Sequence, residues 1–423
     1  MTSTSSTPTL VQACLERRQR LMDELSEGLV LVRGAAASGV NENFRYLTGI
    51  AEPRGALLLA PEGARIQTGR RWPGRDYVKG KMARSILFLP SRDPLLAKWG
   101  EDAAAVADDA TPGAHAVDAI FAVSDLSEVL SRALLDVDVL HVVRSGVPAL
   151  GGDPDGDALF VDDLRRRFFG LTVTDATPVV HGMRRLKGPE EIVQMEQAAL
   201  VTGEAVEHVM RVARPGMREH ELEGEVLRVY RSHNAGLAFE TIVAAGGNAC
   251  LLHYTANAGR VMAGDLVLLD TGASLAGYRA DVTRTFPAGG RFTPRQREVY
   301  EVVLRAEQAV IEACRPGAKL EELHAIAWDV IEAAGFSAHF PHGTSHYLGL
   351  DTHDVGQMSE PLQAGAVITV EPGIYLPEEG IGVRIEDDVL ITGSGHRVLT
   401  EAIPKTVAAV EALTAGGRRA GGP

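Results

Sequence analysis

The feature that most constrains this chain is a set of five candidate metal ligands in four short stretches of sequence that lie far apart. Four of them are carboxylates and one is an imidazole: Asp270, Asp281, His346, Glu371 and Glu386. Four carboxylates carry the charge that neutralises two divalent cations, and a pair of cations ~3.5 to 4 Å apart is a common means of activating water. The set predicts a fold that gathers distant segments at one two-metal site of a hydrolase.

The first two acids lie at the ends of apolar runs. Asp270 ends DLVLLD and Asp281 opens ADVTRTF, and the glycine-containing segment between them predicts a β-hairpin with one acid on each strand. A buried carboxylate costs several kcal/mol unless it is paired or ligated, and a metal meets that need. The alternatives are a turn cap at Asp270 and an ion pair of Asp281 with Arg279 or Arg284.

The remaining ligands come from two more strand-like runs and a histidine cluster. Glu371 follows AVITV, and Glu386 lies inside IGVRIEDDVLI, where a side chain facing water is the alternative. The segment PHGTSHYLGLDTHD holds His342, His346 and His353, and clustered histidines near acids suit metal ligation or proton transfer. An oxygen-rich set favours Mn²⁺, with Co²⁺, Fe²⁺ and Zn²⁺ as alternatives.

Length and patterning predict two domains. The 423 residues exceed the usual limit of one hydrophobic core. In the first part, apolar runs such as GLVLV and SILFLP alternate with helix-like segments, which is typical of an α/β domain. Gly188 and Pro189 then mark a helix start. We place an N-terminal α/β domain at 1–178, with an assembly or substrate-gating role, and a catalytic domain at 179–423.

An internal echo divides the second domain. The triplet Arg214–Gly216 precedes a helix pattern that ends at Gly236, and Arg315–Gly317, 101 residues later, precedes one that ends at Gly335. Such triplets are ordinary helix punctuation, so coincidence is the alternative. Two candidate ligands follow the first copy and three follow the second. The pattern predicts duplicated halves with the metals where they meet.

Composition limits the kinds of binding partner and the cellular compartment that we expect for this protein. A net charge of -14 repels nucleic-acid phosphate and anionic membrane surfaces. No apolar run reaches signal-peptide length near the start or the roughly 18 residues of a membrane span. The three cysteines are odd in number and lack a CxxC pattern. We therefore expect a cytoplasmic protein that binds neither nucleic acid nor membrane.

Together these motifs resemble the pita-bread metallopeptidases of family M24, and within it the proline-specific branch that contains aminopeptidase P and prolidase. The segments HGTSHYLGLDTHDVG, EPGIY and GVRIEDD carry the resemblance, which covers roughly residues 180 to 410. FRYLTGIAEPRGALLLAPEG is similar to the creatinase-like N-terminal domain of the same branch. The resemblance implies an α+β pita-bread catalytic domain with pseudo-twofold halves.

The resemblance also implies how the five ligands share the metals. Asp270 would chelate one ion, Asp281 and Glu386 would bridge both, and His346 and Glu371 would complete the second. The metals would activate a water molecule for attack on the peptide carbonyl. Glu371 would accept the proton and pass it to the leaving nitrogen.

Five further residues receive substrate roles from the resemblance. His253, in NACLLHYTANAG, would contact the substrate near the scissile bond, although the residues alone favour a packed or surface histidine there. His353 would help to stabilise the tetrahedral intermediate. Three residues would line the pocket for proline: His342, Tyr375 and Arg384.

The implied activity is release of the N-terminal residue from peptides with proline second, by a homodimer or homotetramer. The residues between His342 and His346 are Thr344 and Ser345 after a glycine, and this HGTSH segment resembles aminopeptidase P. Prolidases, the alternative, more often have a segment similar to HGLGH at that place. Methionine aminopeptidases and creatinase-like enzymes match less well, and a metal-free peptide-binding protein would not need the ligand set. Asn43 stands where related enzymes can carry an acid, which puts subunit contacts there in doubt.

Overall fold

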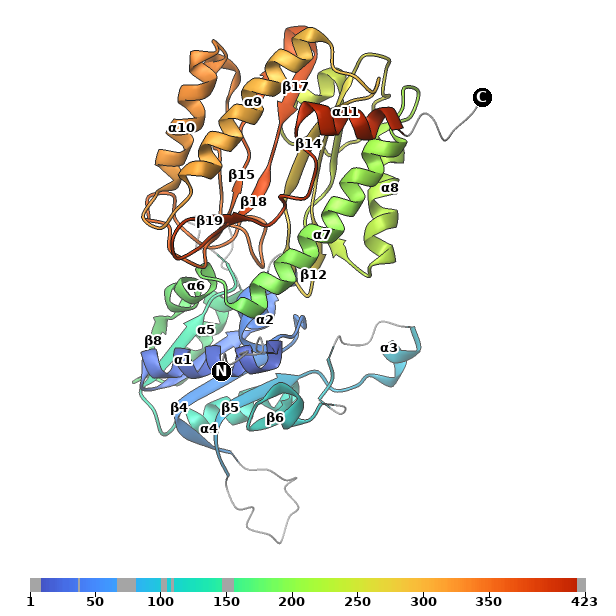
Figure 1. Cartoon of the computed structure of the whole chain (residues 1–423). Coiled ribbons are helices and arrows are strands. Elements are labelled where there is room, and N and C mark those ends of the chain that lie inside the picture. The colour runs from blue at the N-terminus through green and yellow to red at the C-terminus, as the bar shows by residue number, and fades with distance from the viewer. Residues whose placement is uncertain are drawn as a thin grey trace, which may run out of the picture. The chain divides into compact units, whose positions relative to one another are not determined.

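The structure is a computed structural model that describes residues 9–36, 39–66, 81–99, 105–107, 110–146 and 156–416 (Figure 1). Backbone contacts divide the chain into two compact units, Met1–Arg184 and Arg185–Pro423. Each unit has its own hydrophobic core. None of the helices within the described ranges is both long enough and apolar enough to cross a bilayer.

The first unit is built on a six-stranded mixed sheet in the order β6-β5-β4-β1-β7-β8. Its strands are β1 (Leu29–Arg33), β4 (Ala56–Ile66), β5 (Lys81–Leu89), β6 (Ala119–Ala122), β7 (Val139–Val143) and β8 (Thr172–Asp175). The strands β2 (Ala35–Ala36) and β3 (Gly39–Val40) form a separate ribbon. The helices are α1 (Leu10–Leu25), α2 (Glu42–Thr48), α3 (Pro94–Trp99), α4 (Leu126–Ala133), α5 (Gly156–Arg167) and α6 (Thr177–Arg185). The apolar runs of the sequence are strands, as predicted.

Helices in the second unit come as two pairs and a final helix. They are α7 (Pro189–Val212), α8 (Glu219–Ser232), α9 (Pro294–Ala313), α10 (Leu320–Ala333) and α11 (Val407–Gly416). Gly188 is the N-cap of α7 with proline at its first position, and the Thr293 side chain caps α9 by accepting from the Gln296 backbone N–H. The predicted starts of these helices are confirmed.

Short antiparallel strands carry the acids of the second unit. One sheet contains β10 (Ile242–Ala245), β11 (Leu266–Thr271) and β14 (Val282–Pro287), and another contains β15 (Val367–Val370), β18 (Asp387–Ile391) and β19 (His396–Val398). Two further sheets are formed by β9 (Gly236–Leu237), β12 (Ala273–Leu275) and β13 (Tyr278–Arg279), and by β16 (Gly373–Leu376) and β17 (Ile381–Arg384). In Figure 1 the green pair α7 and α8 and the orange pair α9 and α10 flank these strands.

The sequence echo is also a structural repeat. The N–H of Gly216 donates to the carbonyl of Val261 at 2.8 Å, and 101 residues later the N–H of Gly317 donates to that of Leu362, also at 2.8 Å. Both glycines have positive φ, +99° and +91°, which a side chain would disfavour. The turn before α8 and the turn before α10 therefore share the same backbone hydrogen bond and the same positive-φ glycine.

The repeat also places the acids. Asp270 lies in β11, and 101 residues later Glu371 directly follows the corresponding strand β15. Asp281 directly precedes β14, and Glu386 directly precedes β18. Each half therefore supplies one acid from the end of one strand and one from the start of its antiparallel neighbour.

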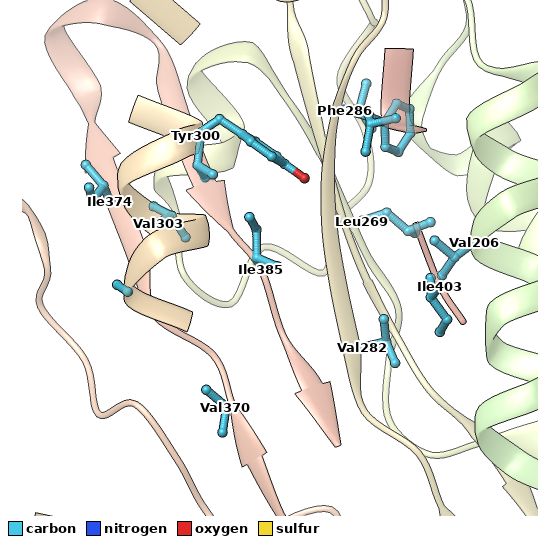
Figure 2. Close-up of a cluster of buried hydrophobic side chains, with 14 of the residues drawn as sticks. Val206, Leu269, Val282, Phe286, Tyr300, Val303, Val370, Ile374, Ile385 and Ile403 are labelled. Carbon is cyan, nitrogen blue, oxygen red and sulfur yellow. The ribbon is translucent and has the colours of Figure 1, made fainter. Parts of the chain in front are cut away.

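One continuous core holds these strands in place (Figure 2). Val206 of α7 and Leu269 of β11 lie on one side of the central strands, and Tyr300 of α9 and Ile385 lie on the other. Because the strands are packed on both sides and interiors are dense, their ends have little freedom to move. The acids at those ends are held by the core.

Candidate metal centre

A cavity of about 690 Å³ in the second unit brings the predicted site residues together. Nine of the ten line it: His253, Asp270, Asp281, His342, His346, His353, Glu371, Arg384 and Glu386. The remaining residue, Tyr375, is buried behind the wall, where its hydroxyl contacts His342 and Arg384. Residues separated by more than 100 positions thus share one cavity.

Three of the candidate ligands converge on one point. Asp281, His346 and Glu386 each offer a ligand atom, and these atoms all lie within 4.8 Å of one another. His346 Nδ1 lies 3.0 Å from the carbonyl oxygen of Tyr347, which can only accept, so Nδ1 carries the proton. Its Nε2 lone pair therefore faces the acids, 3.6 Å from Asp281 Oδ2 and 3.5 Å from Glu371 Oε1. This is the orientation that a metal-binding histidine requires.

The two carboxylate oxygens of Asp270 differ in their partners. Its Oδ2 accepts from Arg384 Nη2 at 2.7 Å. Its Oδ1 is buried, and no described atom bonds to it. A buried polar atom left in this state costs about 1–3 kcal/mol. A cation bound beside Oδ1 would remove that cost.

Burial and mutual repulsion raise the pKa of the acids. The pKa of Asp281 and that of Glu386 lie well above their usual values, first because both are buried and second because other carboxylates stand nearby. Burial raises the pKa of Glu371 to about 7 and also raises that of Asp270. Without added positive charge, these acids cannot all be ionised together at neutral pH. The donor set therefore fits divalent cations.

The structure contradicts the alternatives that single residues left open. Asp270 lies within β11, opposite Thr283 of β14, and caps no turn. Arg284 is paired with Asp387 at 2.7 Å, and the guanidinium of Arg279 binds the carbonyl of Ala238. Glu386 is 2% exposed and lines the cavity, so it does not lie on an exposed face of a sheet.

Hydrogen bonds join His342, Tyr375 and Arg384, the three residues predicted to line the proline pocket. His342 Nδ1 donates to the Gly343 carbonyl at 2.7 Å, so Nε2 accepts from the Tyr375 hydroxyl at 2.8 Å. That hydroxyl accepts in turn from Arg384 Nη1 at 2.9 Å. Burial lowers the pKa of His342 to about 4, so the ring is neutral at physiological pH. Tyr375 acts as a support for the cavity wall.

Two threonines that the sequence analysis did not single out hold the ligands. Thr283 Oγ1 donates to Glu386 Oε2 at 2.6 Å and accepts from Arg384 Nε at 3.0 Å. Thr369 Oγ1 accepts from the His346 backbone N–H at 3.1 Å. Both lie in fully buried strands beside an acid. A threonine within a strand and two positions from a candidate ligand was the signal in the sequence that could have identified both residues.

The metal-free protein is expected to lose stability as the pH rises from about 4.5 to about 7. Folding raises the pKa of Glu371 from 4.5 to about 7, and a group shifted upward stabilises the fold below its unfolded pKa and loses that contribution as the pH passes the folded one. Urea denaturation of chelator-treated protein should show a loss on the order of 1–3 kcal/mol.

Two controls accompany this pH profile. Saturating divalent cation should remove most of the loss, because it neutralises the acids. The substitution Glu371→Gln should reduce the loss in the metal-free protein by the part that Glu371 contributes, while the raised pKa values of Asp270, Asp281 and Glu386 maintain the rest. A loss in the wild type no larger than that in the variant would contradict the assignment.

Comparisons with known proteins follow the same division of the chain. Residues 193–393 match the model of metallopeptidase family M24, and residues 14–142 match the aminopeptidase P N-terminal domain. An Xaa-Pro aminopeptidase of Haemophilus influenzae is 36% identical over 401 residues, which are 88% of this chain and 87% of the relative.

The chain is also similar to a solved structure over almost its whole length and to a dipeptidase over part of it. Aminopeptidase P from E. coli with the inhibitor Pro-Leu matches with a TM-score of 0.84 at 32% identity, covering 98% of this chain and 100% of that one. An Xaa-Pro dipeptidase of Pyrococcus furiosus is 39% identical over 62% of this chain and 77% of its own length. The predicted fold class, an α/β domain followed by a pita-bread domain, is confirmed.

Proposed function

Because the chain belongs to metallopeptidase family M24, we propose that it is an Xaa-Pro aminopeptidase, which hydrolyses peptides with proline second and releases their N-terminal residue. The observation that carries this proposal is the convergence of Asp281, His346 and Glu386 in one cavity with the remaining predicted ligands. Similarity to Xaa-Pro aminopeptidases extends over most of the chain, whereas similarity to the dipeptidase is partial.

The five predicted ligands, which line one cavity, would hold two divalent cations: Asp270, Asp281, His346, Glu371 and Glu386. Family membership implies divalent metal, and the oxygen-rich set supports Mn²⁺ first, with Co²⁺, Fe²⁺ or Zn²⁺ as alternatives. When bound, such a pair acidifies water and polarises the peptide carbonyl. Thr283 and Thr369 would fix the orientation of two of the ligands through the hydrogen bonds described above.

Proton transfer falls to Glu371. Its carboxylate lines the cavity beside His346, where the attacking water would be held, so it is placed to take a proton and release it. It would accept the proton of the attacking water and deliver it to the leaving nitrogen of proline. The imidazoles of His253 and His353, which line the same cavity, would donate hydrogen bonds to the substrate and to the developing oxyanion.

The wall formed by His342 and Arg384 suits proline. Proline brings a rigid ring and no N–H, so its pocket needs flat faces and no acceptor for a backbone donor. The neutral His342 ring lies edge-on to Phe340, with centroids 5.2 Å apart, and Tyr375 fixes it from behind. This arrangement favours selection of proline on the leaving side of the scissile bond.

Assembly, compartment and the role of the first domain are further proposals. We assign residues 1–178 to assembly or substrate gating, in a cytoplasmic homodimer or homotetramer. Asn43 is 3% exposed, donates to the Arg144 carbonyl at 3.0 Å and accepts from Arg184 Nη1 at 2.7 Å. Its amide is used within its own unit, so the proposed assembly does not depend on this residue.

A substrate panel tests the function. Protein loaded with Mn²⁺ should cleave Xaa-Pro-Yaa and longer peptides, should leave matched Xaa-Ala-Yaa peptides intact and should lose activity with chelator. Hydrolysis of Xaa-Pro dipeptides alone would establish a prolidase instead. Peptide binding without divalent ion or hydrolysis would establish a peptide-binding protein.

We expect His253→Ala to lower turnover while metal content stays near that of the wild type. The side chain of His253 is exposed in the cavity and lies outside the converging ligand set. Loss of one hydrogen bond made in the transition state lowers kcat without disturbing the metals. Steady-state kinetics and metal analysis of the same preparation check this, and a variant that loses its metals would refute the assigned role.

A further inference from the structure

The loop His346–Gly356 carries two of the site histidines and is closed by its own backbone. The Asp354 N–H donates to the Tyr347 carbonyl at 2.9 Å, and the Gly349 N–H donates to the Asp351 carbonyl at 3.1 Å. No described residue hydrogen-bonds the ring of His353, which meets that of His346 edge-on at a centroid distance of 4.3 Å. The position of His353 therefore depends on its backbone.

A buried ion pair lies directly after His353. Asp354 Oδ2 is 3.0 Å from Lys187 Nζ, and each side chain is only 1% exposed. The lysine is fixed from its own side, because its N–H donates to the Gly365 carbonyl at 2.7 Å and the next residue, Gly188, caps α7. The start of the catalytic unit thus supplies the charge that anchors this loop.

The backbone of Gly349 packs directly against the pair. A Cβ on Gly349 would come within 2.0 Å of Asp354 Oδ2 and 2.8 Å of Lys187 Cε. Either charge left alone in this place would cost roughly 3–5 kcal/mol, although a pair replaced by uncharged groups is often neutral for stability. Stability therefore explains this buried pair poorly, whereas its close packing against the loop backbone suits a positioning role.

We propose that Lys187 is a positioning residue for the peptidase reaction, which acts through Asp354 to hold the His353 imidazole against the substrate. The inference rests on the proposed function, because His353 contributes only when a peptide occupies the cavity. Lys187 does not line that cavity and acts at a distance through one carboxylate. The prediction is that its effect on catalysis requires His353.

A double-mutant cycle separates positioning from general support. The paired substitution Lys187→Met with Asp354→Asn removes both charges at nearly constant volume. In the wild-type background it should lower kcat/KM for an Xaa-Pro-Yaa peptide by roughly 10–100-fold, as for other supporting residues of metal sites. In a His353→Ala background the same change should cost less than about threefold. Equal losses in both backgrounds, or no loss in the first, would overturn the inference.

A readout that needs no activity keeps this failure distinct from failure of the proposed function. With Zn²⁺-loaded protein and labelled histidine, the NMR resonance of His353, assigned by its loss in His353→Ala, should shift in the paired variant. An unchanged resonance would refute the positioning role even if no Xaa-Pro peptide is cleaved. Should the paired variant not fold, Gly349→Ala, which displaces Asp354 by its Cβ, serves for both measurements.

A neighbouring ion pair provides the matched control. Arg185, two residues before Lys187 in sequence, forms a partly exposed ion pair with Glu360 in the same unit. The paired substitution Arg185→Gln with Glu360→Gln should leave both kcat/KM and the His353 resonance unchanged. A comparable effect of the control pair would contradict the specific role of Lys187.

Discussion

The substitution Glu386→Gln is expected to abolish peptide hydrolysis, with a loss of at least ~10³-fold in kcat/KM, or about 4 kcal/mol of transition-state stabilisation. Glu386 belongs to the converging trio, and its Oε2 accepts from Thr283 at 2.6 Å. The amide keeps the shape of the side chain but removes the charge and one acceptor. Asp281→Ala should have a similar effect, since Asp281 holds the corresponding place in the other half.

Stability measurements distinguish this result from misfolding. Metal-free Glu386→Gln should be at least as stable as the metal-free wild type, because burial and the neighbouring carboxylates disfavour a negative charge at this place and the amide carries none. Saturating Mn²⁺ should stabilise the wild type by about 2.7 kcal/mol at one hundred times the Kd, and the variant by much less. The exposed Glu401→Gln is the matched control and should behave as wild type. Normal metal-induced stabilisation of Glu386→Gln would remove Glu386 from the ligand set.

The substitution Arg284→Met is expected to lower the free energy of unfolding by about 3–5 kcal/mol, since it removes one of the two cations that pair with the buried Asp387 carboxylate and the donor of four backbone carbonyls. All five N–H groups of this fully buried guanidinium are used: Nε donates to the Pro404 carbonyl, Nη1 to those of Thr283 and Glu386, and Nη2 to Asp387 Oδ1 and the Ile403 carbonyl. Burial alone would raise the pKa of Asp387, yet Arg284 and Lys405 hold it below its usual range. Methionine fills the space without any donor.

Urea denaturation of the metal-free protein measures this loss. Arg297→Met is the matched control, because Arg297 forms an exposed pair with Glu301 and such pairs contribute about 0–1 kcal/mol. The Arg284 variant should also bind metal more weakly, since the carbonyl of Glu386 loses its donor. A change below 1 kcal/mol would show that the network is dispensable for folding.

The predictions from sequence succeeded where local pattern carries the information. Helix starts at Gly188 and Thr293 follow from capping chemistry, and apolar runs that end in acids became buried strands with Asp270 and Glu371 at matching places of a repeat. The roles implied for the individual histidines stay predictions, and the variants above test those of His253 and His353. The role of Tyr375 in the proline pocket also stays a prediction, and its hydroxyl is bonded to His342 and Arg384, which line the cavity.

The sequence by itself determined which chemical groups are present, their order along two repeats and the burial of the strands that carry them. Those properties follow from residue identity and from the period of the backbone, which act over a few residues. Only the tertiary structure decided which groups meet. The bond of Arg384 to Asp270, the lone pair of His346 directed at Asp281, and the pair of Lys187 with Asp354 join distant residues. Such contacts form when two halves pack into one dense core, and no local propensity encodes that packing.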